Sequence, residues 1–216
     1  MNAQQLKNAI LQEAISGRLV PQDPNDEPAS VLLDKIRAEK KRLVKEGKLK
    51  KKDLVETPIP EDKIPFDIPE SWEWVKLGMI SLLIGGYAFK SHEYSQTGCR
   101  VIRISDISED GFINKNIVRY RFNPQLSTYI INNGDILMAM TGGTVGKSLY
   151  IKALPEEKML LNQRVAIIRI QICLKEYVNY VIKSHHIQNI ITESKNSTND
   201  NISMADIFNP NRSLEL

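Results

Sequence analysis

Residues 134–151 read GDILMAMTGGTVGKSLYI, and this stretch decides how the C-terminal part of the chain folds. Residues 135–140 are apolar enough for a buried strand, and residues 149–151 are also typical of a strand. The glycines between the two runs allow the backbone to turn tightly. The stretch therefore predicts a strand, a hairpin-like glycine loop and a second strand.

The same loop contains Gly146-Lys147-Ser148, which invites comparison with a nucleotide-binding P-loop. A P-loop needs glycine five residues before Gly146, where this chain has Thr141, and it needs a helix after the loop. We therefore do not expect nucleotide hydrolysis. Two interpretations stay open: a structural turn, or a loop whose backbone approaches a DNA phosphate. The second gives the DNA-binding candidates Thr141, Gly142, Gly143, Thr144 and Lys147.

Outward from this stretch, apolar or alternating runs predict further strands at residues 72–78, 101–104 and 164–170. Residues 177–192 are typical of a helix. The C-terminal part should therefore be α+β with a strand-rich middle.

The N-terminal part is helical in pattern. Residues 3–16 place apolar side chains at helical spacing, and Gly17 is suited to end that helix. A second helix should begin near Pro28 and end near Gly47. Two short amphipathic helices bury little surface alone, so we expect a coiled-coil-type region that needs a partner. The partner-binding candidates are Leu6, Ile10, Leu32, Ile36 and Leu43.

Residues 48–69 shift to Lys, Asp, Glu and Pro, a composition that favours an extended linker. We place the domain boundary there. The division predicted is a helical region with the start of the basic linker over residues 1–50, and a second domain over residues 51–216.

The net charge of +3 is unevenly distributed. Residues 35–53 hold ten Lys or Arg against three Asp or Glu, a net +7, and subtracting this from +3 leaves −4 for the remainder. Such a segment attracts polyanions, but a solvated helix face is the commoner explanation. Charge alone does not decide between them.

The two cysteines, Cys99 and Cys173, form neither a disulfide framework nor a zinc motif. No apolar run is long enough to span a membrane. We therefore expect a soluble, cytoplasmic protein.

Three further segments carry groups suited to DNA. Residues 85–92 combine glycines, two aromatic rings and a cation, and there we favour DNA contact for Lys90, Ser91 and His92 but a core position for Phe89. Gln163 and Arg164 can hydrogen-bond bases, whereas Asn162 is better explained as a turn cap. Lys115, Arg119 and Arg121 interleave with polar and aromatic residues, and an ordinary exposed strand explains them equally well.

No catalytic constellation is apparent. His185 and His186 are adjacent, so their rings diverge on a helix and make a poor metal pair. We expect no catalytic residue, no metal and no cofactor.

The motifs taken together resemble a known family. LKNAILQEAISGRLVPQDPNDEPASVLLDKIRAEKKRLVKEGKLKKKD, which begins at Leu6, resembles the conserved helical region of type I restriction specificity subunits. The segments IPFDIPESWEWVKLGMIS (64–81), VIRISDI (101–107), GDILMAMTGGTVGKSLYI (134–151), LNQRVAII (161–168) and NIS (201–203) follow in the order that this family has.

The resemblance implies a non-catalytic subunit that reads half of a split DNA site. Its implied partners are double-stranded DNA, a type I adenine methyltransferase subunit and a restriction (translocase) subunit. Family members carry two target-recognition domains, whereas this chain has one, so we expect a truncated or half-length subunit. The N-terminal helices could then form a homodimer. The alternative function is a docking scaffold that no longer reads DNA.

Overall fold

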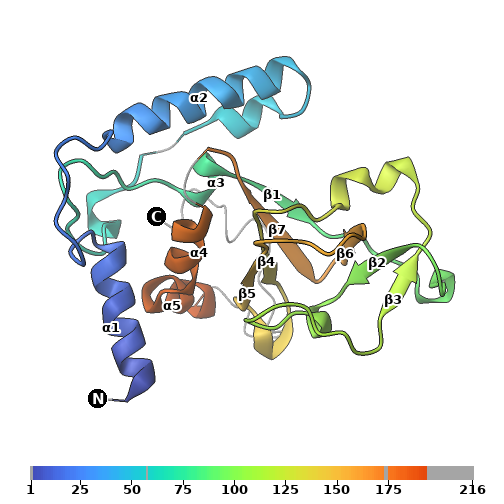
Figure 1. Ribbon diagram of the computed structural model, residues 1–216. Coiled ribbons are helices and arrows are strands. Elements are labelled where there is room, and N and C mark those ends of the chain that lie inside the picture. The colour runs from blue at the N-terminus through green and yellow to red at the C-terminus, as the bar shows by residue number, and fades with distance from the viewer. Residues whose placement is uncertain (1, 57, 173–174, 194–216) are drawn as a thin grey trace. The chain divides into compact units, whose positions relative to one another are not determined.

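The computed structural model describes residues 2–56, 58–172 and 175–193 (Figure 1). The chain forms two compact units, the first within Met1–Ser81 and Gln171–Ile190 and the second within Leu82–Ile170. Helices and mixed sheets confirm the α+β class. No helix among the described residues is both long and apolar enough to cross a bilayer. The division into residues 1–50 and 51–216 stays a prediction.

Both N-terminal helices are confirmed. Helix α1 (Ala3–Ile15) begins with a capping box, in which Asn2 and Gln5 each accept the other's backbone N–H at 2.8 Å. Gly17 follows with a φ of +69°, a left-handed conformation that suits glycine at a helix end. Helix α2 (Ala29–Lys45) begins directly after Pro28.

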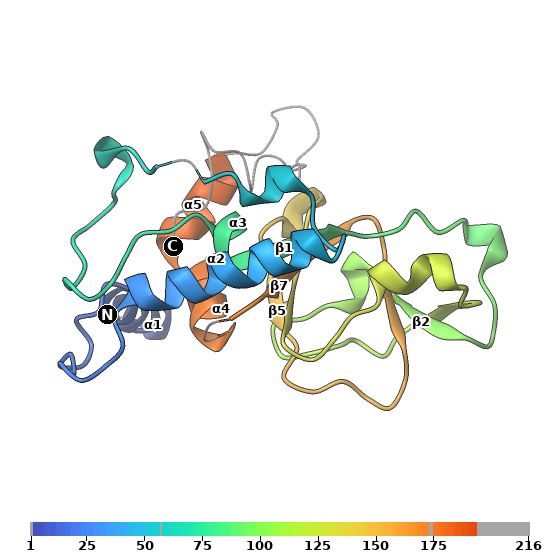
Figure 2. The ribbon, with the colours of Figure 1, turned by 90° about the horizontal axis from the view of Figure 1, so that it is seen from above.

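The segment expected to be an extended linker is partly packed. The short turn η1 (Lys51–Leu54) lies against α2, beside which it runs in Figure 2. Arg37 of α2 forms an ion pair with Glu56 at 3.0 Å. Helix α2 also contacts the short helix α3 (Leu77–Ile80). The prolines exclude long regular elements here, but they do not prevent the chain from following the surface of a helix. A second turn, η2 (Glu61–Lys63), follows.

The strand predicted over residues 72–78 is wrong. That segment forms no strand, and α3 begins at Leu77. The alternating apolar pattern of this segment instead reflects two tryptophans, Trp72 and Trp74, that pack against other parts of the chain. The indole Nε1 of Trp72 donates to Gln22 Oε1 at 2.9 Å, and its ring meets Tyr177 edge-on. Trp74 packs against Phe66 with ring centroids 4.9 Å apart.

The predicted C-terminal helix is two helices, α4 (Lys175–Lys183) and α5 (His185–Glu193). Ser184 lies between them, and its hydroxyl accepts the N–H of Ile187 at 3.3 Å. Helix α4 contacts α1. The NIS segment and Cys173 lie outside the described residues.

The second unit contains two small sheets. The four-stranded sheet has the order β1 (Ser81–Gly85), β7 (Val165–Ile170), β4 (Asp135–Ala139), β5 (Ser148–Tyr150). The three-stranded sheet has the order β3 (Val118–Tyr120), β2 (Cys99–Ile102), β6 (Met159–Leu161). Strands β4 and β7 are antiparallel and pair over five residues, while β2 and β6 are parallel.

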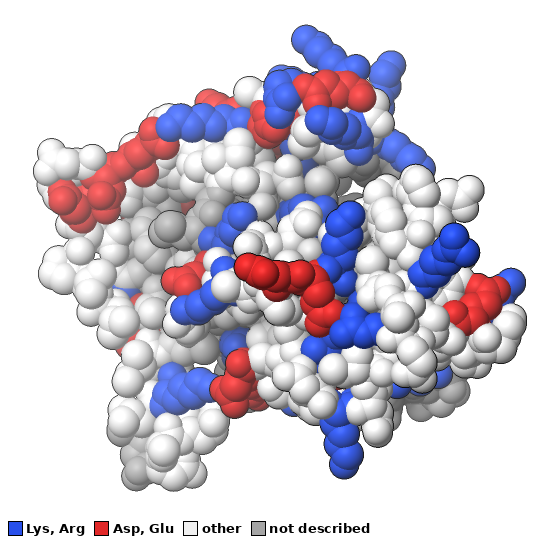
Figure 3. Space-filling view, turned by 45° about the vertical axis from the view of Figure 1, so that its right-hand side comes forward, with Lys and Arg blue, Asp and Glu red and all other residues white. Residues whose placement is uncertain are grey.

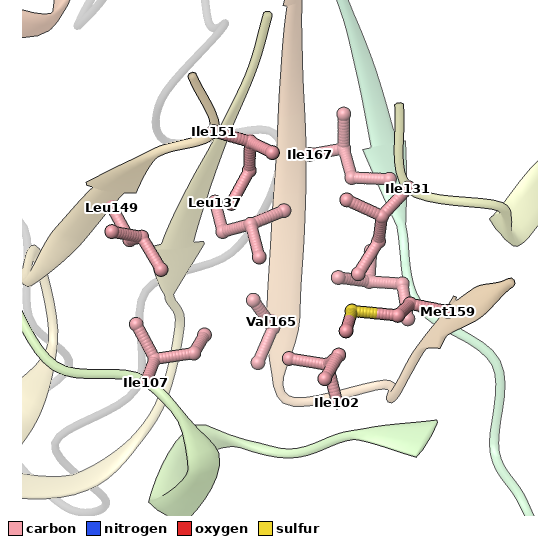
Figure 4. Packing of buried hydrophobic residues seen from close by; sticks show 10 residues of the cluster. Ile102, Ile107, Ile131, Leu137, Leu149, Ile151, Met159, Val165 and Ile167 are labelled. Carbon is pink, nitrogen blue, oxygen red and sulfur yellow. The ribbon is translucent and has the colours of Figure 1, made fainter. Parts of the chain in front are cut away.

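The two sheets share one apolar core. Side chains of Leu137 and Val165, from the four-stranded sheet, lie with Ile102 and Met159 of the three-stranded sheet (Figure 4). All four are fully buried. This core gives the loops at the strand ends a rigid base.

Candidate nucleic-acid interface

The loop after β1 is joined to the turn after β6 by its backbone. Tyr87 donates its N–H to Leu161 O at 2.9 Å and accepts the N–H of Gln163 at 3.0 Å. Gly86 allows this approach, because a Cβ there would lie 2.0 Å from Asn162 O. The segment that carries Lys90 is therefore held against the turn that carries Gln163.

The glycine loop is joined to the same turn. Met140, at its start, donates its N–H to Arg164 O at 3.0 Å. The antiparallel pairing of β4 with β5 on either side confirms the hairpin-like loop. The tip is the short turn η6 (Gly142–Thr144), and all three of its residues are exposed. Thr141 and Lys147 flank the tip and are half-buried.

The turn itself is shaped by Asn162. Its side-chain Oδ1 accepts the N–H of Arg164 at 3.4 Å, and its carbonyl accepts the N–H of Val165 at 2.9 Å. This confirms the expected capping role. The side chains of Gln163 and Arg164 remain exposed.

An open pocket of about 420 Å³ lies beside this turn. Its lining consists of Phe89, Tyr94, Arg103, Ile104, Ser105, Asn162, Gln163 and Arg164. Both formally charged groups in that lining are arginines. Phe89 is buried in a cluster with Val101, Leu126 and Leu160, which confirms the core position expected for it.

The short turn η3 (Ser91–Glu93) directly follows Lys90 and contains His92. Lys90 and His92 lie 3.4 and 3.7 Å from Glu93, and their side chains are 69% and 76% exposed. Exposed contacts of this kind contribute little to stability. Tyr120 also donates to Glu93, and this hydrogen bond is the main reason why the pKa of Glu93 is lowered.

The candidates around β3 do not belong to the lining of that pocket. Arg119 donates to Glu157 at 2.6 Å and to Gly98 O at 3.0 Å, so its guanidinium joins protein segments. Lys115 and Arg121 are exposed, and neither lines the pocket. Their contact with DNA stays a prediction.

The basic segment carries many internal pairs. Arg42 forms ion pairs with Glu39 and Glu46, and Lys35 pairs with Glu27 at 2.6 Å. Figure 3 shows blue and red side chains interspersed on the face it presents. This pattern favours a solvated helix face.

The partner-binding candidates fall into two groups. Leu6 and Ile10 on α1 are 46% and 48% exposed, and Leu32 is half-buried. Ile36 and Leu43 are buried within the first unit, so they are not presented to a partner.

Sequence reasoning missed Arg103, Tyr94 and Ser105 in the pocket lining. Arg103 stands in the quoted VIRISDI segment, three residues before Asp106, and that spacing could have indicated the ion pair that the two residues form at 2.9 Å. Nothing in the local pattern marks Tyr94 or Ser105. Within the described part of the chain, no group of His, Cys, Asp and Glu is arranged to hold a metal.

Comparison with known proteins identifies close relatives. A family model described as the type I restriction modification DNA specificity domain matches residues 69–209. The type I restriction enzyme EcoAI specificity subunit of Escherichia coli is 41% identical over 184 residues, which are 83% of this chain and 30% of that subunit. The EcoEI specificity subunit of Escherichia coli is 56% identical over 79 residues, which are 36% of this chain and 13% of that subunit.

Solved structures agree on the fold. The HsdS subunit from Thermoanaerobacter tengcongensis gives a TM-score of 0.51 at 16% identity, over 98% of this chain and 44% of that one. A structure described as concerning complex assembly and conformational transition of the type I R-M system gives 0.53 at 17% identity, over 99% and 45%. The chain thus spans less than half the length of these relatives. On the family match, the chain belongs to the type I restriction-modification DNA specificity family.

Proposed function

We infer that this chain is the DNA sequence-recognition subunit of a type I restriction-modification complex, reading one half of a split site. The observation that carries this inference is the convergence of two predicted DNA-binding segments, 85–92 and 141–147, on a third, the turn 162–164. Backbone hydrogen bonds hold all three, and contacts to DNA depend on such fixed positions.

The groups at this turn suit both kinds of DNA contact. Lys90, Lys147 and Arg164 are cations for phosphates, which position a protein on the duplex. Gln163 and Arg164 have the donors and acceptors that read adenine and guanine in the major groove. We therefore assign target recognition to the part of residues 51–216 that forms the two sheets.

Specificity subunits are non-catalytic, so methylation and cleavage belong to partner subunits. We propose an adenine methyltransferase subunit and a restriction (translocase) subunit as these partners, in the cytoplasm. The half-exposed Leu6 and Ile10 on α1 are suited to packing against a partner helix, or against a second copy of this chain.

DNA binding by matched double variants tests the proposal. Lys147→Gln/Arg164→Gln removes one charge from turn 162–164 and one from the glycine loop joined to it, and Lys41→Gln/Lys45→Gln removes two from exposed positions on α2. We expect the first variant to bind random duplexes much more weakly. The salt slope, which is the steepness with which the logarithm of the binding constant falls with the logarithm of the salt concentration, should decrease by about two, because each lost phosphate contact lowers that slope by about 0.9. The second should change little.

Equal losses from both variants would move the DNA contacts to the basic helix. If the wild type binds the methyltransferase subunit but no DNA at all, the chain is a docking scaffold instead.

A further inference from the structure

Arg103 is held by a buried carboxylate. Asp106 Oδ2 accepts from Nε and from the backbone N–H of Arg103, and Oδ1 accepts from Nη2, all at 2.9 Å. The Asp106 side chain is only 3% exposed. A two-point ion pair of this geometry fixes the plane of the guanidinium. The hydrogen bond to Asp106 also raises the pKa of Arg103, which therefore stays a cation.

A third contact holds the same side chain. Nη2 also donates to Asn116 O at 2.7 Å, in the loop before β3, where Asn116 has a φ of +54°. These contacts use Nε and Nη2. The remaining nitrogen, Nη1, donates to no group in the described part of the chain.

The surroundings of Arg103 favour an anion. Arg103 lines the same pocket as Arg164, and no Asp or Glu belongs to that lining. Its side chain is 27% exposed, so an outside group can reach it. Asp106 offsets the charge of Arg103, so Arg164 supplies the net positive charge of the lining, while the ordered guanidinium offers Nη1 to a phosphate without a cost for ordering the arginine.

We propose that Arg103, positioned by Asp106, binds a backbone phosphate of the DNA at this pocket, beside Arg164. This inference rests on the proposed function and deepens it. A phosphate contact carries no base information, so Arg103 fixes the register of the recognition domain on the duplex. Gln163, in the same pocket lining, is left to distinguish bases.

A charge-neutral double variant tests the role of Arg103. Arg103→Gln/Asp106→Asn removes the pair together, so the net charge is unchanged and no buried carboxylate is left unpaired. Arg18→Gln/Glu13→Gln is the matched control, because it removes an exposed arginine–carboxylate pair from the first unit. Asp106→Asn alone adds one positive charge but releases the guanidinium. The readouts are the affinity of the full chain for random duplexes, its salt slope between roughly 50 and 200 mM, and the melting temperature.

We expect the Arg103 double variant to bind every duplex about tenfold more weakly, with the salt slope lowered by about one. Asp106→Asn should also weaken binding, despite its added charge. The control should bind as the wild type does.

Wild-type affinity and slope in a folded Arg103 double variant would overturn the phosphate contact while leaving the proposed function intact. A loss confined to one sequence would overturn it too, because that result assigns base reading to Arg103. If the wild type binds no DNA, the proposed function itself has failed.

Discussion

Gly86→Ala is expected to separate the loop after β1 from the turn after β6. A Cβ at Gly86 would lie 2.0 Å from the carbonyl oxygen and 2.2 Å from the carbonyl carbon of Asn162, and 2.7 Å from the nitrogen of Gln163. All three are backbone atoms, so no flexible side chain can move aside. One of the two segments must shift.

The shift breaks the two hydrogen bonds that join Tyr87 to Leu161 and Gln163, at 2.9 and 3.0 Å. Each is worth about 1 kcal/mol, and forcing packed backbone apart adds about 1 to 3 kcal/mol. We expect a loss of about 3 to 5 kcal/mol in the unfolding free energy of the second unit. Binding to DNA should weaken as well, since the two segments no longer present their cations together.

Denaturant unfolding followed by circular dichroism measures this loss, and hydrogen exchange locates it at the amides of Tyr87 and Gln163. Gly143→Ala is the matched control, because a Cβ there meets nothing within 4 Å. Its stability should stay within about 0.5 kcal/mol of the wild type. A Gly86→Ala variant with wild-type stability and protected amides would refute the reasoning.

Three further predictions concern other parts of the chain. Asp135→Asn breaks a two-point ion pair with Arg169, in which both contacts are 2.8 Å and the carboxylate is 1% exposed. A denaturant titration should show that the free energy of unfolding falls by about 3 kcal/mol. Burial lowers the pKa of His186 below 6.5, so the unfolded chain binds the imidazole proton more tightly than the folded chain does. The melting temperature should therefore fall as the pH drops below 6.5, and it should fall less in the variant His186→Leu. Ile10→Asp should abolish co-purification with a partner subunit at unchanged melting temperature, whereas Ile36→Asp should unfold the first unit.

Each of these predictions has a contradicting result. Asp34 also forms an ion pair, with Arg37, but its side chain is 76% exposed, so Asp34→Asn should lower the free energy of unfolding by less than about 1 kcal/mol. An equal loss of stability in Asp34→Asn and Asp135→Asn would refute the burial argument. An unchanged pH profile in His186→Leu would assign the acid sensitivity to other groups. Retained partner binding in Ile10→Asp would remove α1 from the docking surface.

The sequence predicted those elements whose pattern is strong and local. Helices α1 and α2 and strands β4 and β7 each carry a long apolar pattern with clear end signals, and the structure has them. Strand β6 is three residues long, too short for any periodicity to be visible. It exists because tertiary pairing with β2 stabilises it.

The candidate site divides in the same way. Lys147 and Arg164 were found because cations beside glycines and amides are suited to DNA by residue type alone. The joining of their loops was not predictable, because it depends on a tertiary hydrogen bond from the Met140 N–H to Arg164 O. The burial of Ile36 also depends on tertiary packing, since a helical stripe does not reveal whether its own chain or a partner covers it.

Methylation mapping tests the central claim most directly. The chain is co-expressed with the type I methyltransferase subunit of its host, the complex is purified, and the cellular DNA is sequenced by a long-read method that detects methylated adenine. We expect a split adenine-methylated motif with the wild-type chain and its loss with Lys147→Gln/Arg164→Gln. An assembled complex that leaves no motif with the wild-type chain would contradict the assignment of DNA recognition to this protein.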